Sequence, residues 1–232
     1  MLEISYIGLS VLMVLIIVLT YYKYAKVVIT NKKTLLRKMS ILVGFLIFWF
    51  AYLTFLSSQE ILFDLNLPPK IPILIFLPLI ITTLIFYRFN KNDLVLKAIP
   101  KTYPVYYQTF RIFVELILLF TFYKNIIPET ATFEGWNFDI LMGITAPFMA
   151  YFVFRGKVKN LFLAKMWNVL GIFMVLFVAF IIATGFYQPQ IWGSETQLVQ
   201  FKFVQMPYLL IAGFLAPSAI FMHIVSLMQL QK

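Results

Sequence analysis

The chain has 232 residues, of which 62% are hydrophobic and 12% are charged, and its mean hydropathy is +0.91. This composition excludes a soluble globular domain and indicates an integral membrane protein. The net charge of +10 does not indicate nucleic-acid binding, because the basic residues stand at the ends of apolar runs and not in a cluster on a solvated face. The absence of cysteine excludes disulfides, thiolate metal sites and cysteine nucleophiles.

The first two membrane helices are predicted at residues 4–22 and 39–57. The first run is uncharged and long enough to cross about 30 Å of hydrocarbon as a helix. It lacks the basic start and the small-residue cleavage pattern of a signal peptide, so we expect it to be retained. The segment between the two helices contains only basic charges, which places it in the cytoplasm. Glu60 and Asp64 follow the second helix and indicate an external loop.

The third and fourth helices are predicted at residues 71–87 and 106–125. The third contains Pro78, which is tolerated in a membrane helix where neighbours or water bond the freed carbonyl group. The fourth is interrupted by Gln108, Arg111 and Glu115, which leaves its register open. Either it begins near residue 104 and buries both charges, or it begins near Arg111. We favour an intermediate register that places Arg111 near the inner head groups.

The last three helices are predicted at residues 138–154, 167–187 and 203–230. With these assignments, every Lys and Arg except Lys70, Lys124 and Lys202 lies on the cytoplasmic side, as the positive-inside rule requires. We therefore expect one all-α membrane domain, 1–232, built as a bundle of seven transmembrane helices. Its N-terminus is expected outside and its C-terminus in the cytoplasm.

The loop before the fifth helix is acidic and aromatic, which suits the external membrane–water interface. Tryptophan in particular is enriched where an apolar ring can meet the polar head groups. We predict an exposed recognition surface in this loop, formed by Glu129, Glu134, Trp136 and Asp139.

Two charged residues of the fourth helix, Arg111 and Glu115, are four positions apart and so share one helix face. Each charge at the bilayer centre costs about 2.5–3.5 kcal/mol, whereas an exposed pair at this spacing returns only about 0.2–0.5 kcal/mol. The pair therefore does not offset its own burial. Two interpretations stay open, namely a packing ion pair near the inner interface and a ligand or proton site in a wet cavity.

The only histidine, His223, lies in the seventh helix, and Asn168 begins the sixth helix from the same side of the membrane. By depth alone, Arg111, Glu115, Asn168 and His223 can meet in the cytoplasmic half of the bundle. We predict a binding site from these four residues. The alternative for His223 is a hydrogen bond to a neighbouring helix without any ligand.

Several segments resemble an uncharacterised family of bacterial multi-pass membrane proteins. These segments are FRIFVELIL, TFEGWNFDILMGITAP, WNVLGIF and PSAIFMHIVSL. The resemblance covers roughly residues 110–230 and is most specific in TFEGWNFDILMGITAP. It implies a bacterial inner-membrane protein and transfers no activity, because none is assigned to the family.

Missing residues and motifs argue against several cofactors and enzyme classes. Microbial rhodopsins share seven helices and this orientation, but they form a Schiff base on a lysine of the seventh helix, and residues 203–231 contain none. Retinal is therefore disfavoured. A single histidine disfavours bis-histidine haem, and no metal site is predicted. The chain also lacks GxSxG, HExxH and Walker motifs.

Three functions follow in order of preference. The first is a non-enzymatic membrane protein that binds a lipid or small hydrophobic ligand, or that serves as a subunit of a membrane complex. The second is a small-molecule or proton-coupled transporter in which Glu115 titrates. The third is a membrane-embedded enzyme that uses Glu115 and His223 as acid and base on a lipid. The expected partners are membrane lipids and either partner subunits or further copies of the chain, with no nucleic acid.

Overall fold

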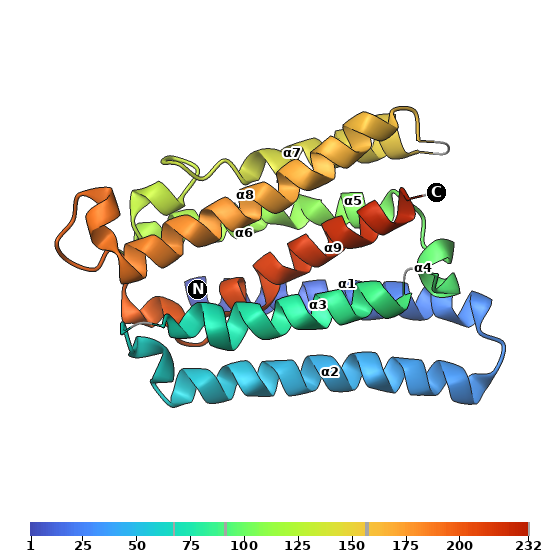
Figure 1. The fold of residues 1–232 in the computed structure, drawn as a ribbon, viewed down its shortest axis with the longest axis horizontal. Helices are drawn as coiled ribbons and strands as arrows, with labels where there is room; N and C mark the ends of the chain where they lie inside the picture. The colour runs from blue at the N-terminus through green and yellow to red at the C-terminus, as the bar shows by residue number, and fades with distance from the viewer. Residues whose placement is uncertain (67, 91, 156–157, 232) are drawn as a thin grey trace.

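The computed structural model describes residues 1–66, 68–90, 92–155 and 158–231. These residues form helices and connecting loops without any strand, and six helices are long and apolar enough to cross a membrane. Long helices run alongside one another, with the loops gathered at the two ends of the molecule (Figure 1). This architecture fits the predicted all-α, multi-pass membrane protein. Three basic residues assigned to the cytoplasmic side, Lys91, Lys157 and Lys232, lie outside the described residues.

The six candidate spans include short 3-10 (η) and π-helical (η) segments that continue the α-helices. They are Leu2–Val28 (α1), Lys32–Ser58 (α2), Pro72–Phe76 (η2) with Leu77–Asn90 (α3), Tyr103–Tyr107 (α5) with Gln108–Phe110 (η3) and Arg111–Phe122 (α6), Leu161–Tyr187 (α8), and Ile211–Leu215 (η8) with Ala216–Gln229 (α9). A short helix, Leu94–Ala98 (α4), connects the third and fourth spans.

The predicted fifth span corresponds to a shorter apolar helix, Ile140–Met149 (α7), which continues as a π-helical turn, Ala150–Phe154 (η5). Such helices of 10–17 residues reach at most about 26 Å at 1.5 Å per residue, which is less than the about 30 Å of a hydrocarbon core. Helix α7 packs against the span that contains α6. By length and composition, six helices of the described chain are candidate spans, compared with the seven predicted.

Two helices begin earlier than predicted, each at an asparagine cap. Helix α2 begins at Lys32 and not near residue 39, because the side chain of Asn31 accepts hydrogen bonds from the backbone N–H groups of residues 33 and 34. Helix α8 begins at Leu161 and not at residue 167, and the Asn160 side chain caps it in the same way. Both predicted spans were begun after the last basic residue of the segment, Lys38 or Lys165, so the first turns of the two helices were not predicted.

The last span begins later than predicted, at Ile211 and not at residue 203. The preceding residues form a 3-10 turn, Phe201–Val204 (η7), followed by an irregular segment that contains Pro207. This segment is apolar because Phe203, Val204 and Leu209 are buried in the core. Burial inside the protein and burial in lipid give the same hydropathy, so the sequence did not separate the two.

The fourth span begins at Tyr103, so Arg111 lies near its middle and is 1% exposed. This finding corrects our preference for a position near the inner head groups. The structure instead corresponds to the other register that the sequence left open, in which the helix begins near residue 104 and buries both charges. Pro104 stands in the first turn of the helix, where its missing N–H group costs no hydrogen bond.

Two backbone carbonyl groups that lose their helical hydrogen bond to a proline accept one instead from an aromatic side chain of α2. A proline removes the hydrogen bond to the carbonyl four residues before it. For Pro217 that carbonyl belongs to Gly213, and Trp49 Nε1 donates to it at 2.7 Å. For Pro78 the equivalent carbonyl accepts a hydrogen bond of 3.0 Å from the hydroxyl of Tyr52. Helix α2 thereby joins the last span to the third.

The centre of the bundle is formed by the spans that contain α6 and α9. In each of them 56% of the most apolar 18-residue window is buried, whereas the corresponding value for the α3 span is 6%. Helix α9 packs against α8 on one side and against α3 on another. Figure 1 shows α9 crossing between the α8 layer and the α1–α3 layer. Polar residues on α6 and α9 are therefore enclosed by protein and not by lipid.

Candidate functional site

The site is built around Arg111, at the start of α6. Its Nε donates to Asp139 Oδ2 at 2.7 Å, and its Nη2 donates to Asp139 Oδ1. Both side chains are buried. Asp139 immediately precedes α7 but makes no capping hydrogen bond with its side chain. The carboxylate is instead held by two parallel bonds from the guanidinium group, which is the strongest arrangement for this pair.

The other edge of the guanidinium group contacts α8 and α9. Arg111 Nη1 lies 3.0 Å from His223 Nε2, and Nη2 donates to the carbonyl oxygen of Gly171 at 3.2 Å. Because a guanidinium group can only donate, His223 Nε2 must accept. The imidazole hydrogen then lies on Nδ1, which donates to Asn168 Oδ1 at 3.0 Å. The amide of Asn168 in turn donates to the carbonyl of Ala164 at 2.8 Å, so the network fixes one neutral tautomer of the histidine.

Glu115 is also buried, but it does not form an ion pair with Arg111, which was one of the two interpretations left open by the sequence. The four ion pairs found among the described residues do not include it. Its Oε2 instead accepts a hydrogen bond of 2.7 Å from Asn137 Nδ2. Asn137 Oδ1 accepts the backbone N–H of Asp139 at 2.9 Å. A single asparagine thus connects the carboxylate of Glu115 to the segment that carries Asp139.

The structure brings three of the four predicted site residues into one hydrogen-bonded network. Arg111 contacts His223 directly, and His223 contacts Asn168. Glu115 joins this network only through Asn137, which the sequence analysis did not propose. A weak signal for Asn137 was present, since an Asn side chain commonly bonds the backbone N–H two positions on, which here belongs to Asp139.

The acidic loop divides into exposed and buried residues. Glu129, Glu134 and Trp136 are exposed, as expected for a recognition surface. Asp139 is 6% exposed, which corrects its assignment to that surface. A buried arginine needs a carboxylate partner, and Asp139 supplies it from the neighbouring loop, whereas Glu115 lies closer in sequence. The sequence could not identify this partner because the packing of α6 against α7 was unknown.

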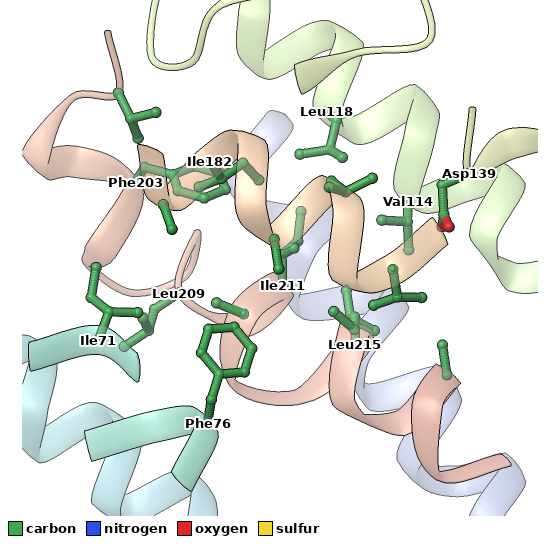
Figure 2. Close-up of a pocket in the computed structure, with 18 of the residues that line it drawn as sticks. Ile71, Phe76, Val114, Leu118, Asp139, Ile182, Phe203, Leu209, Ile211 and Leu215 are labelled. Carbon is green, nitrogen blue, oxygen red and sulfur yellow. The ribbon is translucent and has the colours of Figure 1, made fainter. Parts of the chain in front are cut away.

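A cavity of about 70 Å³ adjoins the network, between α6, α8, η8 and η2. Figure 2 shows Val114 and Asp139 at one side of this cavity and Ile71 and Phe76 at the other. One water molecule needs only about 15 Å³, so the cavity can hold a larger group. Its lining is apolar except for Tyr187 and for the side chains of Arg111, Glu115 and Asp139.

The chain matches no protein-family model, and neither a curated protein nor a solved structure matches it. Among the described residues, no group of three or more His, Asp or Glu side chains could hold a metal ion. The fold and the site together define a helical multi-pass protein with a buried ion-pair network beside an apolar cavity. The functional interpretation therefore rests on the residues of this site.

Proposed function

We propose that the protein is a non-enzymatic membrane protein that binds a lipid or small hydrophobic ligand in the cavity beside Glu115. The observation that supports this function is a cavity with an apolar lining and ionisable side chains at one end. Ligand sites in proteins commonly combine a mostly apolar wall with a few polar groups that orient the ligand. Ionisable residues within a membrane protein also mark functional sites more often than packing contacts.

Packing alone accounts for only part of the polar cluster. The pair of Arg111 and Asp139 ties α6 to the start of α7 and satisfies both charges. Glu115 is outside this pair, lines the cavity and accepts one hydrogen bond from Asn137. A second buried carboxylate adds a desolvation cost that the helix contacts do not offset. A ligand that contacts Glu115 explains why the cost is tolerated.

Filling the cavity tests this function. Ala183 lines the cavity from α8. In Ala183→Phe the added phenyl ring occupies the cavity, so the amount of ligand bound per protein is expected to fall at least about tenfold while the protein stays folded. The measurement is native mass spectrometry of protein extracted gently from its own membrane. Ala51→Phe is the matched control, since Ala51 is exposed on α2. Equal ligand retention in the wild type and in Ala183→Phe would contradict the proposed site.

The same proposal includes seven spans in a bacterial inner membrane, with Ile140–Phe154 as the short fifth span, the N-terminus outside and the C-terminus in the cytoplasm. It is supported by the loops, because residues 123–139 and 158–160 lie at opposite ends of the molecule (Figure 1). Basic residues also gather at the end that contains α4 and the start of α2. Glu134 and Lys159 are exposed, one at each end.

Thiol labelling tests the topology, since the chain has no cysteine of its own. A membrane-impermeant maleimide is expected to label Glu134→Cys in intact cells. It is expected to label Lys159→Cys only after the membrane is permeabilised, because that position faces the cytoplasm. Labelling of both variants in intact cells would mean that Ile140–Phe154 does not cross the membrane.

A second candidate is a proton-coupled carrier in which Glu115 titrates. One observation favours it: polar residues continue along α9 from His223 toward the cytoplasmic end. Ser226 Oγ and Gln229 Oε1 are enclosed and have no hydrogen-bond partner among the described residues. Enclosed polar atoms of this kind usually bond water, and water along this line would connect the network to the cytoplasm. A subunit role is the third candidate, with Glu129, Glu134 and Trp136 as the contact surface for a partner.

A further inference from the structure

A groove lies at the end of the molecule where α1 begins and α6 ends. Its volume is about 510 Å³, and it shares no lining residue with the cavity beside Glu115. We call it the lysine groove, and its lining residues are Met1, Leu2, Glu3, Lys124, Ile126, Gln200, Lys202 and Tyr208. The groove is therefore a candidate site separate from the ion-pair network.

A backbone hydrogen bond joins the two segments that carry the lysines of this groove. After α6 the chain turns at Asn125, which has a left-handed backbone conformation with a φ of 56°, as asparagine adopts more readily than most residues. The carbonyl oxygen of the next residue, Ile126, then accepts the backbone N–H of Gln200 at 2.9 Å. This bond holds the segment of Lys124 beside the segment of Lys202.

The base of the groove orients one lysine and one carboxylate. Tyr208 is 3% exposed, and its hydroxyl donates to Glu3 Oε1 at 3.3 Å. Lys202 Nζ lies 3.5 Å from the same carboxylate oxygen. It also lies 5.4 Å from the centre of the Tyr208 ring, within the range of a cation–π contact. Glu3 and Lys202 therefore neutralise each other above a buried aromatic ring.

The second lysine gives the groove a surplus positive charge. Lys124 forms none of the four ion pairs found among the described residues. Its side chain is exposed, so water solvates the ammonium group and burial does not oppose its charge. With Glu3 matched by Lys202, the side chains that line the groove carry one positive charge in excess.

The groove lies at the depth of lipid head groups. Two of the candidate spans end beside it, since α1 begins at Leu2 and α6 ends at Phe122. Polar head groups occupy the layer directly beyond the hydrocarbon core that such spans cross. Lys124 and Lys202 are also two of the three basic residues that the predicted topology leaves outside the cytoplasm. The positive-inside rule therefore does not explain them.

We propose that the lysine groove binds the head group of an anionic phospholipid. The ammonium groups of Lys124 and Lys202 donate to the phosphate oxygens, because charge-assisted bonds to phosphate are among the strongest hydrogen bonds. Leu2 and Ile126 give the groove an apolar part for the start of the acyl chains. A head group with one net negative charge balances the surplus positive charge. A zwitterionic head group does not, since it brings a cation of its own.

The test compares an anionic lipid, a zwitterionic lipid and a free phosphate compound. Dioctanoyl phosphatidylglycerol, dioctanoyl phosphatidylcholine and glycerol phosphate are titrated into the delipidated protein in dodecyl maltoside, and native mass spectrometry counts the molecules bound. We expect phosphatidylglycerol to bind at one molecule per protein and about fivefold more tightly than phosphatidylcholine, which is the effect of about one charge at a membrane surface. Glycerol phosphate, which lacks the acyl chains, is expected to bind more weakly than either lipid.

Two variants with opposite expected effects assign the preference to the groove. Lys124→Gln removes an exposed charge, so the fold should be retained and the preference for phosphatidylglycerol lost. Glu3→Gln removes the carboxylate of the groove but keeps an oxygen that accepts from Tyr208, so phosphatidylglycerol should bind more tightly. Lys70→Gln is the matched control, because Lys70 pairs with Asp64 at 3.6 Å and does not line the groove. It should keep the wild-type preference.

Each other result overturns the proposal. Equal affinity of the wild type for the two lipids would mean that the groove does not select an anionic head group. A preference that survives in Lys124→Gln, or that Lys70→Gln loses equally, would mean that the charge responsible lies elsewhere. Glycerol phosphate that binds as tightly as phosphatidylglycerol, and only with Lys124 present, would make the ligand a free phosphate compound and not a lipid. The cavity beside Glu115 has its own test in Ala183→Phe, so the two proposals fail separately.

Discussion

Replacing Arg111 with leucine is expected to lower the free energy of unfolding by about 3–5 kcal/mol, the cost typical of removing one partner of a buried ion pair. The carboxylate of Asp139 would then be left 6% exposed without its counter-charge. The acceptors on His223 and Gly171 would also lose their donor. Unfolding by sodium dodecyl sulfate from dodecyl maltoside micelles, followed by circular dichroism, measures the change.

The double replacement Arg111→Leu with Asp139→Leu separates the ion pair from the rest of the network. With both charges removed, no unpaired ion stays buried, so the double variant is expected to be more stable than Arg111→Leu alone. Buried pairs replaced by apolar residues of similar volume are often neutral in stability. Arg88→Leu is the control for removing an arginine, because Arg88 is exposed at the end of α3. Asp139→Leu alone completes the comparison: if the double variant is destabilised by the sum of the two single effects, the bidentate pair does not stabilise the fold.

The positions of the apolar helices could be predicted from the sequence because hydropathy reports the requirement that dominates in a bilayer. A long apolar run has no other stable arrangement in lipid than a helix with its backbone hydrogen bonds satisfied internally. The predicted helix starts were less accurate, since the side-chain caps at Asn31 and Asn160 begin α2 and α8 before the basic residues after which the prediction placed the spans. The segment before Ile211 was misassigned because residues buried in protein and residues facing lipid are equally apolar.

The candidate site was predicted in part, and its limits have a physical cause. Depth in the membrane follows from sequence position, so Arg111, Asn168 and His223 could be grouped before their contacts were known. Helix adjacency does not follow from sequence position. The only partner for Arg111 considered from the sequence was therefore Glu115, one turn away on the same helix, whereas the structure places Asp139 against it from the loop before α7. The cavity depends on the same unknown packing, and no sequence pattern marked it.

The contact between α8 and His223 of α9 depends on Gly171, a residue without a side chain. A Cβ atom added to Gly171 would lie 2.2 Å from His223 Nε2 and 2.9 Å from Met142 Cε. The methionine end can move, but the imidazole cannot. It is bonded to Asn168 on one side and to Arg111 on the other, and the ring of Trp167 packs against it with the ring centroids 5.2 Å apart.

Gly171→Ala is therefore expected to destabilise the protein although alanine favours helices. Overpacking in a core costs about 1–3 kcal/mol, and displacing the histidine leaves buried donors without partners at a further cost of about 1–3 kcal/mol. Gly44→Ala is the matched control in α2, because nothing lies within 4 Å of an added Cβ atom there. That change should be neutral or stabilising by up to about 1 kcal/mol. The same detergent titration measures both variants.

A double-mutant cycle shows whether the cost of Gly171→Ala arises at the histidine. His223→Ala alone leaves Arg111 Nη1 without its acceptor and Asn168 Oδ1 without its donor, and it should therefore destabilise the protein. Once the imidazole is absent, the added methyl group at position 171 has space. The double variant should therefore be destabilised by less than the sum of the two single variants. Additive effects would mean that the cost of Gly171→Ala arises elsewhere than at the imidazole. A Gly171→Ala variant as stable as Gly44→Ala would mean that α8 and α9 move apart at this contact at little cost.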